Sequence, residues 1–321
     1  MADVTKSSAP AGAAANLVAS GYSGLAPGEF GTGAMTTGAR TQWQTVLRRF
    51  RRHRAAMISV GLFVLLVLVA IVLPWFYSYD HTYTGGDSFE EPTAAHILGT
   101  DQLGRDMVAL ILRGTQYSLL ISIVVGVMAT VIGVSLGALS GYLGGVIDTL
   151  VNRVVDLFLI LPLVAVAGIL VHAFAGSWYV VALVLGLFSW MTVARINRGE
   201  TLSLAQREFV EAARALGAGT PRIVFRHILP NLTGIITVNA TLAVATAVLA
   251  EAALSFIGLG VQPPDTSLGL IIQQNYAQFG GARWWLFWPP FLTIVAISLC
   301  INFIGDGLRD AFDPRQTRVR A

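Results

Sequence analysis

Charged residues are scarce in this sequence, and their scarcity excludes an ordinary soluble domain. Only 12% of the 321 residues are charged, whereas 55% are hydrophobic and the mean hydropathy is +0.67. Soluble domains carry about twice that charged fraction. Several long apolar runs place the chain among membrane proteins instead.

Lysine and cysteine are almost absent, and each absence removes a class of function. The only lysine, Lys6, has no glycine before it, so the chain lacks the glycine-rich loop that cradles nucleotide phosphates. Any ATP-driven role therefore needs another subunit. The one cysteine, Cys300, cannot form a disulfide within the chain. The histidines are scattered, so no metal site is predicted. The sequence also concentrates no nucleophile–base pair or paired carboxylates, so an enzyme is not expected.

Six apolar runs approach the ~20 residues that a helix needs to cross a hydrocarbon core of ~30 Å. Backbone polar groups in lipid must be satisfied within each segment, so these runs are expected to be helices. The predicted fold class is an all-α polytopic membrane protein with six transmembrane helices. The predicted spans are 55–76, 118–139, 154–171, 179–192, 234–256 and 285–304.

The arginines set the predicted orientation. With the N-terminus inside, 18 of the 21 basic residues fall on the cytoplasmic side, and only Arg105, Arg113 and Arg283 fall outside. The positive-inside rule then places both termini in the cytoplasm. The arginine run at 48–54 abuts the first span, where it favours anionic lipid headgroups over nucleic acid as its partner.

The chain divides into four predicted regions. Residues 1–40, rich in Ala, Gly, Ser and Thr, are predicted to be a disordered cytoplasmic tail. Residues 41–114 hold the first span and an external loop, 115–310 form the transmembrane core, and 311–321 form a cytoplasmic C-terminal tail. Glycines around Asp101, Arg105 and Asp106 of the external loop predict tight turns with local ion pairing. A structural loop and a docking site for a partner are both compatible with this pattern.

Two patterns concern helix packing. The second span runs into glycines at every fourth residue, on one helix face, where a neighbouring backbone can approach closely. They are Gly133, Gly137, Gly141 and Gly145. In the third span, Pro162 predicts a kink, and Asp156 is predicted to pair with Arg153 across one helical turn.

The segment between the fourth and fifth spans carries helix signals of its own. Ser203 and Gln206 fit a capping box, so a helix is expected to begin near Leu204. An apolar stripe follows at helical spacing. It consists of Phe209, Ala212, Ala213 and Leu216.

A glycine turn and a second helix are expected after that stripe. Gly217 or Gly219 can adopt the left-handed conformation that ends a helix. Thr220 and Pro221 then suit the start of a second helix, which is expected to stop before Pro230. The result is a compact bent element at the cytoplasmic membrane surface, suited to contact with a cytoplasmic partner.

This segment resembles the EAA motif of ABC importer permeases. The matching residues are Glu211, Ala212, Ala213, Gly217, Leu229 and Pro230. His227 departs from the general motif, but peptide-transporter members share the Arg-His-Ile-Leu-Pro-Asn that stands here. Segments 96–106, 251–260 and 302–314 are similar to those of the C-type permeases of dipeptide and oligopeptide importers. The resemblance covers about residues 45–315.

The resemblance implies a type I ABC importer permease fold in a bacterial cell membrane, and a division of labour. The loop 200–231, with its six EAA residues, would couple this chain to two ABC ATPase subunits, which would bind ATP and Mg²⁺. A second, B-type permease would complete the pore, and an extracytoplasmic binding protein would deliver peptide. This chain would bind no cofactor. A permease for nickel or another small solute is an alternative, and an ATP-independent channel or secondary transporter is an alternative of another class.

Polar side chains within the last two spans are candidates for the transport pathway. They are Asn239, Glu251 and Asn302. Glu251 lies near the outer end of the fifth span, where it could line the pathway, form a gate or reach water at the outer surface. Asn239 and Asn302 suit hydrogen bonds between helices better than contacts with substrate.

Overall fold

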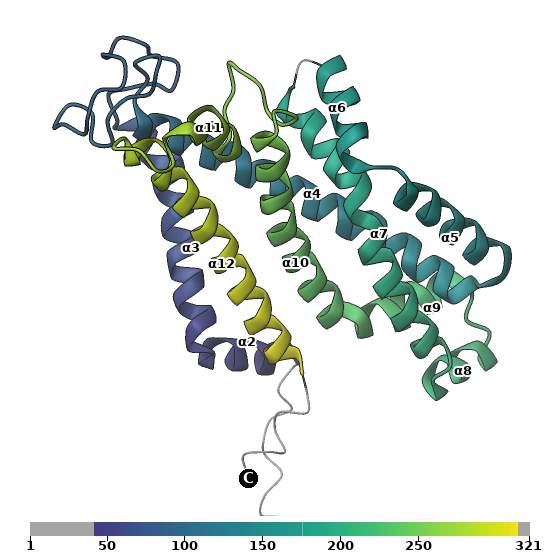
Figure 1. Cartoon of the computed structure of the whole chain (residues 1–321). Coiled ribbons are helices and arrows are strands. Elements are labelled where there is room, and N and C mark those ends of the chain that lie inside the picture. Colours follow the sequence, from purple (N-terminus) through teal and green to yellow (C-terminus); the bar gives the residue numbers. More distant parts are fainter. Residues whose placement is uncertain (1–41, 175, 314–321) are drawn as a thin grey trace, which may run out of the picture. The chain divides into compact units, whose positions relative to one another are not determined.

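The computed structural model of the chain describes residues 42–174 and 176–313, and within these ranges the protein is helical, as predicted. The predicted tail at 1–40 and residues 314–321 of the predicted C-terminal tail lie outside these ranges. The unit Thr45–Ala321 contains all the helices except the first residues of α2. In chain order the helices are α2 (Gln42–Arg52), α3 (Arg54–Val72), α4 (Met107–Leu143), α5 (Gly145–Ile160), α6 (Leu163–Ala173), α7 (Trp178–Ala205), α8 (Glu208–Ala215), α9 (Thr220–Ile223), α10 (Leu229–Phe256), α11 (Leu268–Asn275) and α12 (Trp288–Phe312) (Figure 1).

Four short non-α turns adjoin these helices in the described ranges. The 3₁₀ turn Leu73–Trp75 follows α3, and the 3₁₀ turns Tyr276–Gln278 and Trp284–Leu286 lie between α11 and α12. A π-helical turn, Val224–Ile228, joins α9 to α10. Helix α10 therefore continues directly into the cytoplasmic segment that precedes it.

Five helical stretches in the described ranges are long and apolar enough to cross a membrane. They are Arg54–Trp75, Met107–Leu143, Trp178–Ala205, Thr220–Phe256 and Trp284–Phe312. The predicted third span is instead a bent pair, α5 and α6, whose axes meet at 80°. Leu161 has extended backbone because a residue before proline is pushed out of the helical region. Pro162 therefore breaks this span, where the sequence predicted only a kink.

Four spans are longer than their predicted boundaries of 118–139, 179–192, 234–256 and 285–304. Hydropathy marks only the part of a helix that lies in hydrocarbon. The backbone hydrogen bonds of a helix continue into water, so polar residues prolong these helices beyond the apolar runs. Helix α7 thus extends to Ala205 on the predicted cytoplasmic side.

Helices α4 and α7 form the most extensive helix pair in the described chain. A Cβ added to Gly133, Gly137 or Gly141 would lie 2.5–2.7 Å from a backbone carbonyl oxygen of α7, closer than real Cβ contacts allow. These three glycines therefore let the two backbones touch. The predicted position of Gly145 on the same face is wrong, because a glycine turn with positive φ ends α4 before it and Gly145 begins α5 with open space around it.

Two ion pairs tie α5 to the predicted cytoplasmic half of α7. Asp156 pairs with Arg195 at 3.3 Å, which corrects the predicted pairing with Arg153 on its own helix. Asp148 accepts two hydrogen bonds from the Arg198 guanidinium, one of 2.7 Å from Nη2. Both aspartates therefore pair with arginines of another helix rather than within α5.

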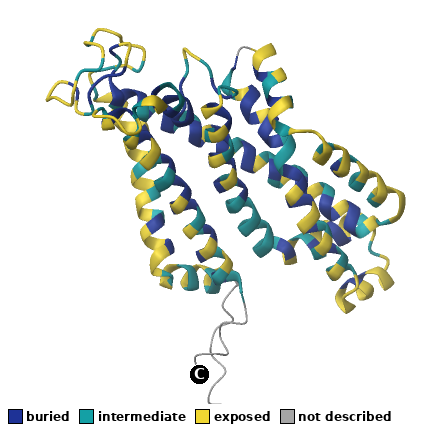
Figure 2. Cartoon of the chain, viewed as in Figure 1, coloured by how far each residue is buried: buried dark blue, intermediate teal, exposed yellow. Residues whose placement is uncertain are grey.

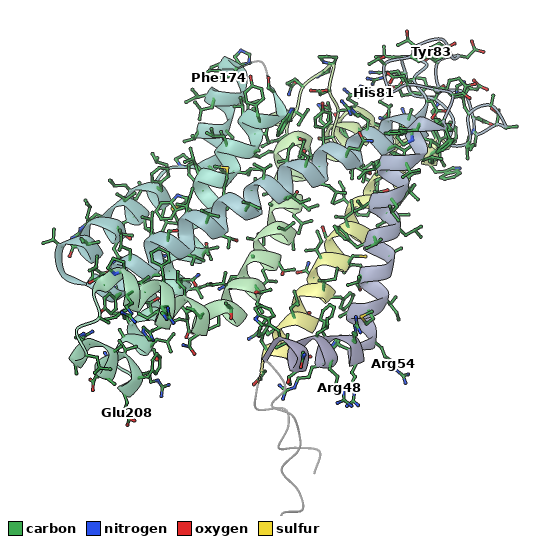
Figure 3. All side chains as sticks on the ribbon, turned by 180° about the vertical axis from the view of Figure 1, so that it is seen from behind. Arg48, Arg54, His81, Tyr83, Phe174 and Glu208 are labelled. Carbon is green, nitrogen blue, oxygen red and sulfur yellow. The ribbon has the colours of Figure 1, made fainter. Side chains whose placement is uncertain are left out.

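The outer helices expose apolar surface. Helix α3 packs beside α12 and buries only Ala56, Ser59 and Ala70, so most of its surface is exposed (Figure 2). This is the pattern of a lipid-facing helix. Arg54 and Glu208 lie at one end of the helices, and Tyr83 and Phe174 lie at the other (Figure 3). This separation agrees with the orientation that the arginines predict.

Candidate coupling site

The candidate coupling site is the segment from α8 to the start of α10. Ser203 lies within α7, so the helix expected to begin near Leu204 is the end of the fourth span, and the predicted capping box is wrong. Helix α7 continues through Ser203 and Leu204 to Ala205, because its backbone hydrogen bonds are not interrupted before Gln206. Helix α8 begins at Glu208, after Arg207 in extended conformation.

Gly217 makes the turn after α8, as expected. It has φ of 79°, its N–H donates to the Arg214 carbonyl at 3.0 Å, and the Ala218 N–H donates to the Ala213 carbonyl at 3.0 Å. These two bonds form a Schellman motif, which satisfies carbonyls left unpaired at the helix end. Thr220 is the first residue of α9, and Gly219, not Thr220, takes the N-cap position.

The second helix does not stop before Pro230, and this part of the prediction is wrong. Pro230 lies in the first turn of α10, directly after the π-helical turn Val224–Ile228, in which the Leu229 N–H donates to the Val224 carbonyl. Proline lacks an N–H and its ring clashes with the carbonyl four residues earlier. The wider π turn shifts the hydrogen-bond register at this point, so the helix passes through Pro230 without ending.

The segment buries one face and exposes another, and the division differs from the predicted stripe. Val210 and Ala213 of α8 are buried, the first of them against a small core. That core consists of Val210, Ile223, Ile228 and Leu232. Phe209, Leu216 and Phe225 are exposed, Leu216 to 89% and Phe225 to 72%. We call these three exposed side chains the apolar cap.

The EAA residues divide along the same lines. Glu211, Ala212, Gly217 and Pro230 are exposed, whereas Ala213 is buried and Leu229 is half-buried. Arg214 lies over the ring of Tyr142 at 5.8 Å, next to the exposed face. Exposed apolar side chains with polar residues around them are typical of surfaces that contact a protein or a membrane. The sequence analysis did not single out Phe225, because its neighbours Val224 and Arg226 give no pattern that marks it as exposed.

The external loop is built around two carboxylates. The Arg105 guanidinium contacts Asp101 at 2.6 Å, and Asp101 also accepts the backbone N–H groups of Leu103 and Arg105. The predicted tight turn with a local ion pair is present, with positive φ at Gly99 and Gly104. Arg105 also donates a hydrogen bond to Gln274 of α11, so this loop is fixed to the helices.

Asp106 is fully buried and caps α4. Its carboxylate accepts the Ala109 N–H at 2.9 Å and the Tyr77 hydroxyl at 3.0 Å, and lies 2.8 Å from His96 Nδ1. Burial, reinforced by the Asp106 charge, raises the pKa of Tyr77, so its hydroxyl stays a donor. The loop near α4 is therefore an ordered structure, whichever partner it meets.

The three polar candidates in the spans differ from one another. Asn302 donates to the Ser298 carbonyl of its own helix at 2.9 Å, so it does not make the predicted bond to another helix. The Asn239 amide nitrogen is buried without a hydrogen-bond partner. Glu251 is fully buried within the chain, so the suggestion that it reaches water is wrong.

Comparison with known proteins identifies the family. Residues 133–318 match the binding-protein-dependent transport system inner membrane component, and residues 41–92 match the N-terminal TM domain of oligopeptide transport permease C. The oligopeptide transport system permease protein OppC of Mycobacterium tuberculosis strain H37Rv is 43% identical over 279 residues, which are 86% of this chain and 95% of that one. The chain belongs to the OppC-type permeases. This confirms the predicted family.

Other relatives agree over the same region of this permease. OppC of Escherichia coli strain K12 is 39% identical over 86% of this chain and 92% of its own length, and OppC of Bacillus subtilis strain 168 is 36% identical over 85% and 90%. The protein is thus the permease component of an ABC transporter in the inner membrane, and the ATPase subunits are separate.

The fold is similar to that of a solved importer. A chain of the MetNI methionine ABC transporter, solved in inward-facing conformations, superposes with a TM-score of 0.53 over 64% of this permease and 98% of that chain. The two sequences are 23% identical, so this match concerns the fold alone. It confirms the expected helical architecture of an ABC importer permease.

Proposed function

We propose that this permease moves oligopeptides into the cytoplasm and that ATPase subunits drive it through the segment from α8 to the start of α10. The observation that carries the proposal is the apolar cap. Three large apolar side chains stand exposed on a segment that already has its own small core. The cap lies at the end where the arginines predict cytoplasm, so a cytoplasmic subunit is the partner that would cover it.

The proposed assembly assigns each step to a different chain. Two ABC ATPase subunits bind ATP with Mg²⁺, one of them on this permease, and a second, B-type permease supplies the other half of the pore. An extracytoplasmic binding protein delivers the peptide at the opposite end, beside the loop held by Asp101, Arg105 and Asp106. The relatives named above are oligopeptide permeases, which supports peptide as the cargo.

The proposed coupling uses the continuity of the fifth span. Thr220–Phe256 is one helical stretch, so a displacement of α9 by a moving ATPase is carried into α10. Helix α8 packs against α9 through Val210 and Ile223 and moves with it. Re-tilting α10 then changes which side of the membrane the pathway faces.

The test is uptake of defined peptides into proteoliposomes that contain the whole complex, with and without the binding protein. Leu216→Ala is expected to weaken ATPase binding about tenfold or more, as truncation of a central interface side chain does. Leu68→Ala, exposed to 52% on α3, is the matched control and should leave assembly unchanged. Equal ATPase binding by both variants would exclude the apolar cap as the docking site, and uptake of nickel but not peptide would overturn the cargo.

A further inference from the structure

Glu251 is a buried ionisable residue that has no role in the coupling proposed above. It lies on α10 and is 0% exposed. Among the described residues, none of the ion pairs includes it. Burying a carboxyl group without a cation is costly unless hydrogen bonds satisfy it. Its hydrogen bonds must therefore offset the cost of its burial.

Two serine hydroxyls donate to the two carboxylate oxygens. Ser118 of α4 donates to Oε2 at 2.8 Å, and Ser255 of α10 donates to Oε1 at 2.7 Å. Both serines also accept a hydrogen bond from the start of α11. The Leu268 N–H donates to Ser118 Oγ at 3.3 Å, and the Ser267 hydroxyl donates to Ser255 Oγ at 3.1 Å.

The hydrogen bonds thus form two short relays, and in both of them the donors point from α11 toward Glu251. Each begins on a polar group at the N-terminus of α11, passes through one hydroxyl and ends on a carboxylate oxygen of Glu251. Ser267 is also the N-cap of α11 and accepts the Leu270 N–H. Chains of hydrogen bonds in the low-dielectric interior reinforce one another.

Two glycines bring the backbones close around this network. A Cβ on Gly114 of α4 would lie 3.0 Å from the Leu268 nitrogen, and one on Gly269 of α11 would lie 2.5 Å from the Ala252 carbonyl oxygen. The first turn of α11 is therefore held between α4 and α10 by direct backbone contact. The space around the two relays is too small for a larger side chain.

We propose that Glu251 is a positioning residue of the transport cycle, which ties the first turn of α11 to α4 and α10 through Ser118 and Ser255. The proposal rests on the proposed function, in which α10 moves. Detaching α11 from α10 would leave a carboxylate buried with its relays broken. Helix α11 is consequently carried along when α10 tilts, and the movement that starts at the apolar cap reaches the outer surface.

The first test is hydrogen exchange of residues 268–275 in the resting complex in lipid nanodiscs. Glu251→Gln replaces one acceptor oxygen by a donor and so breaks one relay, while nearly keeping the side-chain volume. We expect these amides to exchange about tenfold faster, the scale of one lost intramolecular hydrogen bond. Ser118→Ala breaks the relay that begins at the Leu268 N–H by loss of a single hydroxyl, and the same segment should exchange faster.

The matched control is Ser122→Ala, one turn along the same helix. Ser122 is also fully buried, but its hydroxyl donates only to the Ser118 carbonyl of its own helix. This variant should leave exchange of 268–275 as in the unmodified protein. If Glu251→Gln and Ser118→Ala also leave it so, the relays do not hold α11 and the proposal is wrong.

The second test is ATP-driven peptide uptake by the same variants, together with ATPase activity. We expect Glu251→Gln to lower uptake at least fivefold while ATP hydrolysis continues, because the motor is intact and the outer end no longer follows it. Faster exchange with normal uptake would also overturn the proposal. The exchange measurement needs no moving ATPase, so a failure of the coupling proposal leaves its result unaffected.

Discussion

Gly217 offers the sharpest test of the coupling segment, because its surroundings separate backbone strain from crowding. Its φ is 79°, a conformation that side chains other than glycine rarely adopt, yet nothing lies within 4 Å of the position a Cβ would take. A larger residue would not clash there. The whole cost of a substitution therefore comes from the backbone, in contrast to the simple expectation that bulk blocks the turn.

The left-handed conformation costs an L-residue about 1–2 kcal/mol. That cost lowers the population of the formed turn by a factor of about 5–30 relative to its open forms. Gly217→Val, with a β-branched side chain, should lie at the upper end, and Gly217→Asn at the lower end, because asparagine tolerates this conformation. Gly219→Ala is the control, since Gly219 has φ of −72° and its nearest neighbour to an added Cβ is 4.0 Å away.

Two measurements follow the turn and its consequence. Hydrogen exchange of the Ala218 amide reports the Schellman bond to Ala213, and peptide uptake per ATP hydrolysed reports coupling. Both are expected to change in the order valine, asparagine, then the Gly219 control. If Gly217→Val behaves as Gly219→Ala does in both assays, the turn is not needed for coupling and the reasoning fails.

Three other changes test the framework around this segment. Gly137→Ala should destabilise the protein by about 1–3 kcal/mol through overpacking between α4 and α7, seen as earlier thermal unfolding in nanodiscs. Asp156→Ala should lower the free energy of unfolding by less than about 1 kcal/mol, because its ion pair with Arg195 is half exposed. Asp148→Ala should lower it more, because the pair with Arg198 is better buried and bidentate. Thermal unfolding of the two variants compares these losses. Pro230→Ala supplies the missing N–H, which allows the π turn to relax to α-helix and rotate α9, so uptake per ATP should fall; Pro221→Ala, in a first turn where the N–H is unpaired anyway, should not lower it.

Features that depend on a few neighbouring residues could be predicted from the sequence. The left-handed turn at Gly217 and the ion pair between Asp101 and Arg105 are local, and both are present in the structure. The spans could be predicted because lipid imposes one length and one composition on each of them. The ends of the helices could not, because water allows a helix to continue through polar residues such as Ser203.

Features that depend on packing between distant segments could not be predicted from the sequence. Phe209, Ala213 and Leu216 have helical spacing, which predicted one apolar stripe, but Ala213 is buried whereas Phe209 and Leu216 are exposed. Asp156 pairs with Arg195 of α7, 39 positions away in the sequence, and no local pattern indicates that pair. The relays to Glu251 join residues separated by 133 and 150 positions in the chain, a distance over which a single sequence carries no periodic signal.

The packing of the spans indicates which of them can move. In their most apolar stretches α7 is 56% buried within the chain, whereas the span that contains α10 is 28% buried. The glycine contacts make α4 and α7 a rigid pair, since sliding them would force backbone atoms into each other. The fifth span is about 55 Å long if each residue rises 1.5 Å, with the apolar cap near one end and Glu251 near the other. A displacement at the apolar cap is therefore transmitted most easily along α10. The hydrogen-bond relays to Glu251 then make α11 move with α10.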